Sequence, residues 1–254
     1  PANLLVALNA RLSLCEDLEA TLIVGELCQY PFSEELYVGF RNSAHLFCYN
    51  DARSNLLRSK AFFNRRSRRY MVATVLNNLG IVHAWNKDAD EALHLLKQAH
   101  ELLAAIGSDE AYQSEINLGC VCAVIGDLDD ARSWFAEARN KVPRELLLDR
   151  IVIDMNFVIL DFLSGVICLP AANEATIRLS EKAFAVDDPR FVDQISFNAA
   201  AFSKMLGIES AVLPSDEFES AIRDREKTGY EMIIRASVEE PCELLLVLSP
   251  HWRY

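Results

Sequence analysis

The stretch VLNNLGIVHAW (residues 75–85) returns in altered form as SEINLGCVCAV (residues 114–124). Both copies carry Asn-Leu-Gly in otherwise different apolar surroundings, and the two triplets lie 39 residues apart. The same shift carries Leu96 onto Phe135, so the repetition extends beyond the triplet. A fixed period of this length, with one helical hairpin per copy, is typical of a solenoid built from stacked repeats.

Small and large residues recur through the two copies in a way that suits helix packing. Small side chains let the two helices of a hairpin approach closely, and large side chains fill the space between neighbouring hairpins. The small set is Gly80, Ala92 and Ala99 with Gly119, Ala131 and Ala138, and the large set is Leu79 and Leu96 with Leu118 and Phe135. We therefore expect a close helix crossing at each glycine.

Helical spacing of apolar residues runs through most of the chain. It is clearest over 88–106, where Asp88 and Asp90 suit the positive end of a helix dipole and Gly107 is a suitable C-terminal cap. The apolar stripe of this helix consists of Ala92, Leu95, Leu96, Ala99, Leu102, Leu103 and Ile106.

The same pattern predicts a chain of helices and no convincing strand before residue 230. The expected helices are 2–14, 17–29, 34–48, 51–64, 70–85, 88–106, 109–124, 128–140, 144–163, 172–185, 189–206 and 215–227. Their short connections predict antiparallel neighbours. The fold class is therefore all-α, an α-solenoid of antiparallel helical hairpins.

The repeat resembles the tetratricopeptide repeat family. Residues 110–143 carry the family's Leu-Gly pair, its two alanines and its large residue in the second helix, and a closing proline at Pro143. Residues 71–106 match except for that proline, and His83 and Cys122 stand where the family has an aromatic residue. The resemblance implies a superhelix whose first helices line a concave wall, with about five to six hairpins over residues 1–207.

Asparagines recur at one position of this repeat. Asn78 and Asn117 precede the Leu-Gly pairs, and Asn156 lies a further 39 residues on. More distant members of the rhythm are Asn198, Asn42 and Asn9. Each is expected mid-way along a first helix, where asparagine costs on the order of a few tenths of a kcal/mol relative to alanine.

An asparagine side chain offers one acceptor and two donors, enough to hold the backbone amide of an extended peptide whatever its sequence. Some tetratricopeptide superhelices bind peptides through such a ladder, so the resemblance implies a peptide-binding groove here. The alternative is that the asparagines bond neighbouring hairpins. Replacement by alanine would lower partner affinity and leave folding unharmed in the first case, and would lower stability in the second.

Two further features are candidates for partner contacts. Trp85 lies seven residues after Asn78 on the same helical face, so it is either an aromatic anchor in the groove or a packing residue at the hairpin corner. The densest cationic patch of this acidic chain consists of Arg65, Arg66, Arg68 and Arg69. It is either a solvated helix end that complements the dipole or a site for an acidic partner segment.

Composition excludes several classes of function. A net charge of −12 argues against direct nucleic-acid binding. No apolar run reaches the roughly 18–20 residues of a membrane span. The seven cysteines lack framework spacing, which predicts a reducing compartment and thiols that serve as small buried hydrophobes. We expect a cytoplasmic protein.

No enzyme is predicted. The sequence holds no phosphate loop and no Gly-x-Ser-x-Gly, and its histidines share no metal-ligand spacing, so we expect neither a metal nor a cofactor. His83 is interpreted as a hydrogen-bonded core histidine.

The C-terminal part changes character. Apolar runs at Met232–Val238 and Leu244–Leu248 flank Glu-Glu-Pro and predict a short β-hairpin, or a strand with a capping helix. A solenoid needs its last apolar face covered, so residues 208–254 are interpreted as a cap. Pro1 opens almost directly into a helical pattern, which suggests that the chain is part of a longer protein.

These observations favour a protein-interaction scaffold that takes an extended peptide or partner loop in its concave face. The alternative is the sensor or autoinhibitory repeat arm of a larger bacterial signalling ATPase or transcription regulator, whose catalytic part lies outside this chain. The full-length reading frame discriminates between the two.

Overall fold

The computed structural model describes residues 69–85, 87–185, 189–216, 233–236 and 242–247, with isolated positions between 53 and 67. Within these residues the helices are α5 (Arg69–Trp85), α6 (Ala89–Ala105), α7 (Ala111–Ile125), α8 (Leu128–Lys141), α9 (Leu147–Leu163), α10 (Leu169–Phe184) and α11 (Pro189–Met205), and the strands are β1 (Ile233–Ala236) and β2 (Cys242–Leu245). The helices expected at 2–14, 17–29 and 34–48 lie outside the described residues, as do most of those expected at 51–64 and 215–227.

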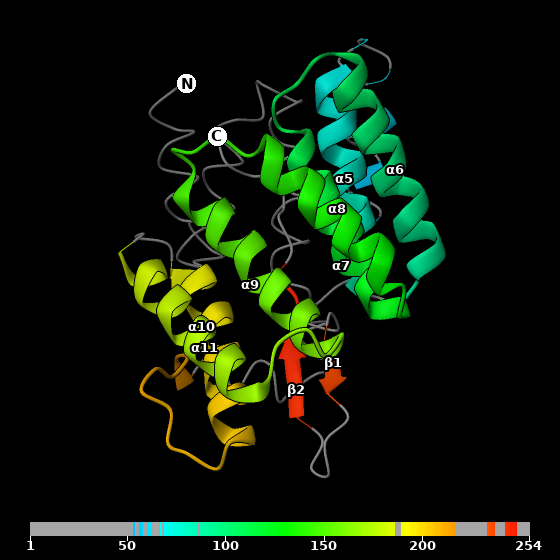
Figure 1. Ribbon diagram of the computed structural model, residues 1–254. Coiled ribbons are helices and arrows are strands. Elements are labelled where there is room, and N and C mark those ends of the chain that lie inside the picture. The colour runs from blue at the N-terminus through cyan, green and yellow to red at the C-terminus, as the bar shows by residue number, and fades with distance from the viewer. Residues whose placement is uncertain are drawn as a thin grey trace.

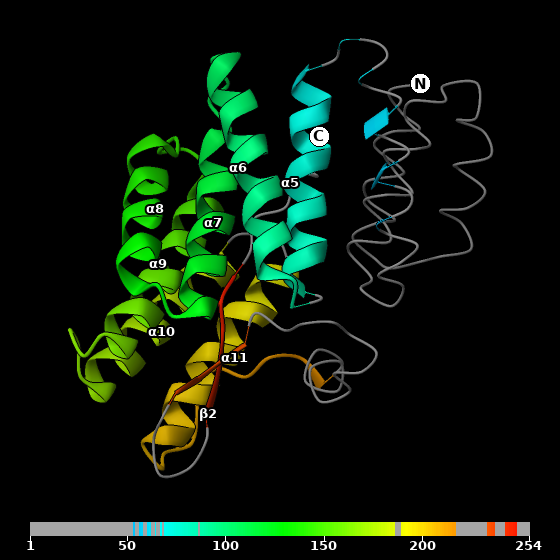
Figure 2. The same ribbon diagram turned by 90° about the vertical axis from the view of Figure 1, so that its right-hand side faces the viewer.

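The described helices confirm the all-α solenoid. Each helix packs against its neighbours in the chain, most closely in the pairs α5–α6 and α7–α8, and the helices follow one another through the molecule (Figure 1). The first helices α5, α7, α9 and α11 also touch one another in that order. The view turned by 90° shows α5 to α8 side by side, with α10 and α11 below them (Figure 2).

The structure corrects the starts of two helices. A helix was expected over 144–163, but α9 begins at Leu147. We expected a helix over 172–185, but α10 begins at Leu169 with Pro170 in its first turn. Proline is tolerated there because the first N–H groups of a helix have no intrahelical partner. The sequence pattern had assigned this proline to the preceding loop.

The close helix crossings expected at the two glycines are confirmed. A Cβ atom at Gly80 would lie 2.6 Å from Cγ of Leu96, and a Cβ atom at Gly119 would lie 2.5 Å from the ring of Phe135. Only hydrogen fits at either position. The Phe135 ring also meets Phe157 of α9 edge to face, with 5.7 Å between ring centroids. One large side chain therefore closes its own hairpin and contacts the next.

The caps at the starts of the second helices α6 and α8 repeat with the 39-residue period. Asp88 caps α6 and Asp127 caps α8, and each accepts a hydrogen bond from the backbone N–H three residues on. Gly107 and Gly126 follow α6 and α7 with φ of 66° and 90°, a left-handed conformation that side chains disfavour. The expected cap at Gly107 is confirmed.

First and second helices differ in how much of their surface is buried. The second helix α6 buries one stripe, namely Ala92, Leu95, Leu96, Ala99 and Leu103. Of the residues expected in that stripe, Ile106 is exposed at the helix end. The first helix α7 is buried almost all round from Ala111 to Ala123, because other helices pack on several of its faces.

The C-terminal strands form a hairpin, one of the two arrangements expected there. β1 and β2 pair antiparallel, with Ile233 opposite Leu245 and Ala236 opposite Cys242. β2 packs on α11, beside which it runs in Figure 2. Leu244, Leu246 and Val247 are buried in the same apolar core as α7 and α9.

We predict that Gly119→Ala destabilises the protein, because the new methyl group would overlap the Phe135 ring. Overpacking of this kind costs about 1–3 kcal/mol. Each kcal/mol lowers the melting temperature of a chain of this size by about 2–4 °C. Thermal melting followed by circular dichroism measures the change.

The variant Gly119→Ala/Phe135→Ala is the matched control, since alanine at position 135 removes the ring that the new methyl group would overlap. The double variant should lose less stability than the sum of the losses in the two single variants. An unchanged melting temperature in Gly119→Ala would show that residue 119 is not at a close crossing.

Candidate functional site

Four of the expected asparagines lie on the described first helices, and all four are buried. They are Asn78 on α5, Asn117 on α7, Asn156 on α9 and Asn198 on α11, hereafter the asparagine row. One asparagine per first helix follows from the repeat, because each repeat turns the same face of its first helix to the same side of the solenoid.

Asn156 binds the backbone of an extended segment of the same chain. Its Nδ2 donates a hydrogen bond to the carbonyl oxygen of Val247 at 2.9 Å, and its Oδ1 accepts one from the backbone N–H of Val247 at 2.8 Å. Both residues are fully buried, and 91 residues separate them in the sequence. One side chain thus satisfies both polar groups of a single residue's backbone.

The position of Val247 explains why it needs this contact. The β1–β2 ladder ends at Leu245, so Val247 has left the sheet while its backbone is still buried. A buried N–H or C=O group without a hydrogen bond is costly. Cys120 of α7 adds a weak bond from its Sγ to the Val247 carbonyl at 3.6 Å, and Asn156 Nδ2 lies 3.4 Å from that sulfur.

Asn117 makes a different contact. Its Nδ2 donates to Oδ1 of Asn77 at 3.0 Å, and both side chains are fully buried. This bond joins α7 to α5 and favours the role of bridging neighbouring hairpins for Asn117. Sequence reasoning missed Asn77, although the Asn77-Asn78 pair preceding Leu79-Gly80 was a visible signal.

Buried acceptors lie one helical turn before two members of the row. Gln113 precedes Asn117 on α7, and Gln194 precedes Asn198 on α11, each by four residues. The side-chain oxygen of each glutamine is buried and accepts no hydrogen bond within the described part of the chain. Residues four apart share a helix face, so these acceptors lie beside the row.

Most of the other predicted contact residues lie outside the described part of the chain. Arg69 is exposed at the start of α5 and Trp85 is the last residue of the same helix, about 25 Å away by helix rise. The side chain of Trp85 lies outside the described residues, as do Asn42, Asn9, Arg65, Arg66 and Arg68. Their roles in a groove or acidic-partner patch remain predictions.

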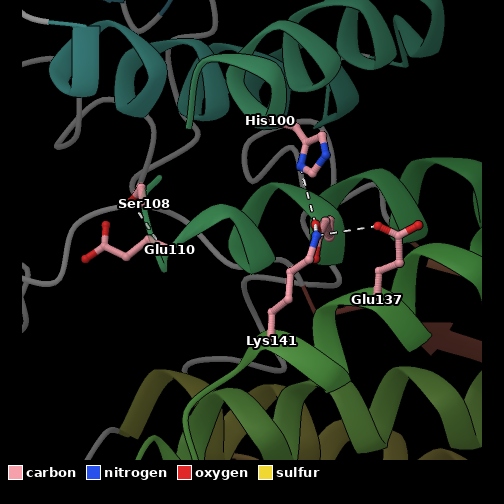
Figure 3. Close-up of polar contacts among 6 residues, drawn as sticks. His100, Ser108, Glu110, Glu137 and Lys141 are labelled. Atoms are coloured by element: carbon pink, nitrogen blue, oxygen red, sulfur yellow. Dashed lines mark hydrogen bonds and ion pairs between the residues drawn. The ribbon is translucent and has the colours of Figure 1, made fainter. Parts of the chain in front are cut away.

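An ionic cluster centred on the buried Glu115 lies on another face of α7 (Figure 3). The fully buried carboxylate of Glu115 pairs with Lys141 of α8 and lies 3.4 Å from His100 of α6, while Lys141 also lies 3.5 Å from Glu137. Burial raises the pKa of the Glu115 carboxyl, and the hydrogen bond from Lys141 opposes that rise. Burial by itself would lower the pKa of the Lys141 ammonium group. The hydrogen bond and the charge of Glu115 outweigh this effect, so the pKa of Lys141 is raised.

This cluster is separate from the asparagine row. Glu115 and Asn117 are two residues apart on a helix and therefore point to nearly opposite sides. The cluster ties α6, α7 and α8 together. In the same view the N–H of Glu110 donates to Oγ of Ser108 at the start of α7 (Figure 3).

His83 and the cysteines show how local surroundings set their chemistry. His83 is buried, as expected, with its Nδ1 3.0 Å from Oδ2 of Asp88, and this hydrogen bond lowers the pKa of the Asp88 carboxyl.

Burial raises the pKa of the Cys120 thiol well above its usual value and that of Cys122 to about 11. Cys168 is exposed, which corrects the expectation of uniformly buried thiols.

The described residues offer no group of three His, Cys, Asp or Glu side chains placed to hold a metal ion. Among the described helices, none has both the length and the apolar character needed to cross a bilayer.

Comparison with known proteins supports the family resemblance over a segment. Residues 71–141 match the family model described as tetratricopeptide repeat. This range covers α5 to α8 and confirms the resemblance carried by the two Asn-Leu-Gly copies. No curated protein matches the chain. Tetratricopeptide repeats generally mediate protein–protein interaction and are typically not catalytic.

We predict that Asn117→Ala lowers stability, because it removes a buried hydrogen bond from Asn77. Loss of a buried partner costs about 1–3 kcal/mol, against a gain of a few tenths from the better helix former. Asn140→Ala, an equal change at an exposed site of α8, should stay within about 0.5 kcal/mol of the parent. Chemical denaturation of both variants measures the difference, and equal stabilities would rule out the bridging role.

Proposed function

We propose that the protein is an interaction scaffold that binds an extended segment of a partner protein along its first helices. Side chains of the asparagine row and its neighbouring glutamines hydrogen-bond the backbone of that segment. Recognition of this kind depends on an extended conformation more than on a particular sequence.

The contact between Asn156 and Val247 carries the proposal. It has the two-bond geometry that an asparagine ladder would use on a peptide, and here the bound backbone is an extended segment of the chain itself. The helix surface at Asn156 is therefore able to accommodate an extended strand.

Two further observations support a wider site. The buried side-chain oxygens of Gln113 and Gln194 lie beside Asn117 and Asn198 without a hydrogen bond in the described residues, and a segment that opens this surface on binding would supply the missing N–H groups. The segment 71–141, which includes the first two members of the row, matches a family of interaction repeats. Scaffold function thus accounts for polar groups that a purely apolar core would not need.

The test begins by capturing partners from the native source with the full chain and mapping the shortest binding segment with synthetic peptides. We predict that methylation of one backbone nitrogen in that segment weakens binding by about tenfold or more, the worth of a hydrogen bond with a buried partner. Alanine at the same residue should have a smaller effect, because the asparagine contacts only backbone.

Two results would contradict the proposal. One is a partner that binds only as a folded surface, with no linear segment able to replace it. The other is a peptide series in which every N-methylated form binds as tightly as the parent.

A further inference from the structure

We propose that residues 242–247, hereafter the C-terminal segment, are an internal ligand that a partner's extended apolar segment must displace. This inference rests on the proposed function, because it assigns the same helix surface to both segments. That surface is formed by α7, α9 and α11, which contact the C-terminal segment through Cys120, through Asn156 and through packing on β2.

The polar part of the contact does not depend on the identity of residue 247. Asn156 bonds only the N–H and C=O of that residue, and every amino acid except proline carries both groups. A segment from another protein can therefore replace the C-terminal segment at Asn156 without losing either hydrogen bond.

The apolar part of the contact defines the partner's chemistry. Leu244, Leu246 and Val247 are all buried against the helices. Leu244 and Leu246 are two residues apart and lie on the same side of an extended chain. A competing segment needs apolar side chains at these three positions, because polar ones would be buried without partners.

The C-terminal segment has few other supports. β2 spans four residues and pairs only with the equally short β1 within the described part of the chain. A two-stranded hairpin is at best marginally stable by itself. Helices α5 to α11 pack on one another along the chain without it, so its release need not disrupt the solenoid.

Internal binding lowers the apparent affinity for an external segment by the fraction of molecules in which the site is open. Val247→Pro removes the N–H that Asn156 accepts and weakens only the internal ligand. Asn156→Ala weakens the internal and the external ligand alike, so its effects partly cancel in the parent chain. The informative comparison is therefore made in the Val247→Pro background.

The probe is a labelled synthetic peptide with the sequence of residues 239–250, carrying serine in place of Cys242. Its affinity is measured for the full chain and for full-length variants. We predict that Val247→Pro binds the peptide about tenfold more tightly than the parent does, which corresponds to release of one hydrogen bond. Adding Asn156→Ala should weaken binding about 10- to 100-fold, whereas adding Asn140→Ala should leave it unchanged.

Opening of the site is measured separately by labelling thiols and locating the label by mass spectrometry. Cys120 lies beneath Val247 and becomes accessible when the C-terminal segment leaves, whereas Cys122, also buried, lies near Asp127 and Asp130. Val247→Pro should raise the labelling rate of Cys120 about tenfold and leave Cys122 unchanged. Equal acceleration at both thiols would indicate general unfolding.

The outcomes separate the two proposals. If the parent binds the peptide as tightly as Val247→Pro does, the C-terminal segment is not a competitor and the inference is wrong. The inference is also wrong if Cys120 stays protected from labelling in Val247→Pro, or if the labelling rates of Cys120 and Cys122 rise together because the protein unfolds. In either case the segment is a permanent cap. If Cys120 opens selectively but no variant binds the peptide, the surface does not accept external extended segments, and the proposed function fails.

Discussion

The close crossing of a glycine in each of the first helices α5 and α7 with a large side chain of the following helix determines the rest of the structure. Gly80 faces Leu96 and Gly119 faces Phe135, and neither glycine leaves room for a Cβ atom. Because Phe135 also reaches Phe157 of α9, the crossing sets the spacing within one hairpin and its contact with the next. Equal spacing along the solenoid brings one asparagine of each first helix into a row.

The row shows two solutions to one physical problem. A buried amide side chain needs hydrogen bonds. Asn117 obtains one from a side chain of the preceding first helix, which joins two hairpins, whereas Asn156 obtains two from the backbone of an extended segment. The same repeat position can thus join neighbouring hairpins in one repeat and bind an extended backbone in the next. Asn156 is the member of the row whose contacts resemble those of a ligand site.

Local pattern determined how much could be predicted from the sequence. Most helix boundaries, the caps at Asp88 and Gly107 and the glycine crossings follow from residues within one or two turns of each other, or from one repeat period, and they were predicted. The start of α10 was misplaced because a proline fits a loop and a first turn equally well.

The candidate site was less predictable because its contacts are distant in sequence. The row itself was visible as a spacing, but the Asn77 partner depends on the rotation of α5 against α7, and the contact with Val247 joins residues 91 positions apart. Exchange of the Val247 amide hydrogen, measured by NMR, tests most directly whether Asn156 holds an extended backbone. Slow exchange in the parent and about 10- to 100-fold faster exchange in Asn156→Ala, with the amides of α7 and α9 unchanged, is the expected result. A Val247 amide that exchanges at the rate of an unstructured peptide in the parent, or at the same rate in both proteins, would contradict it.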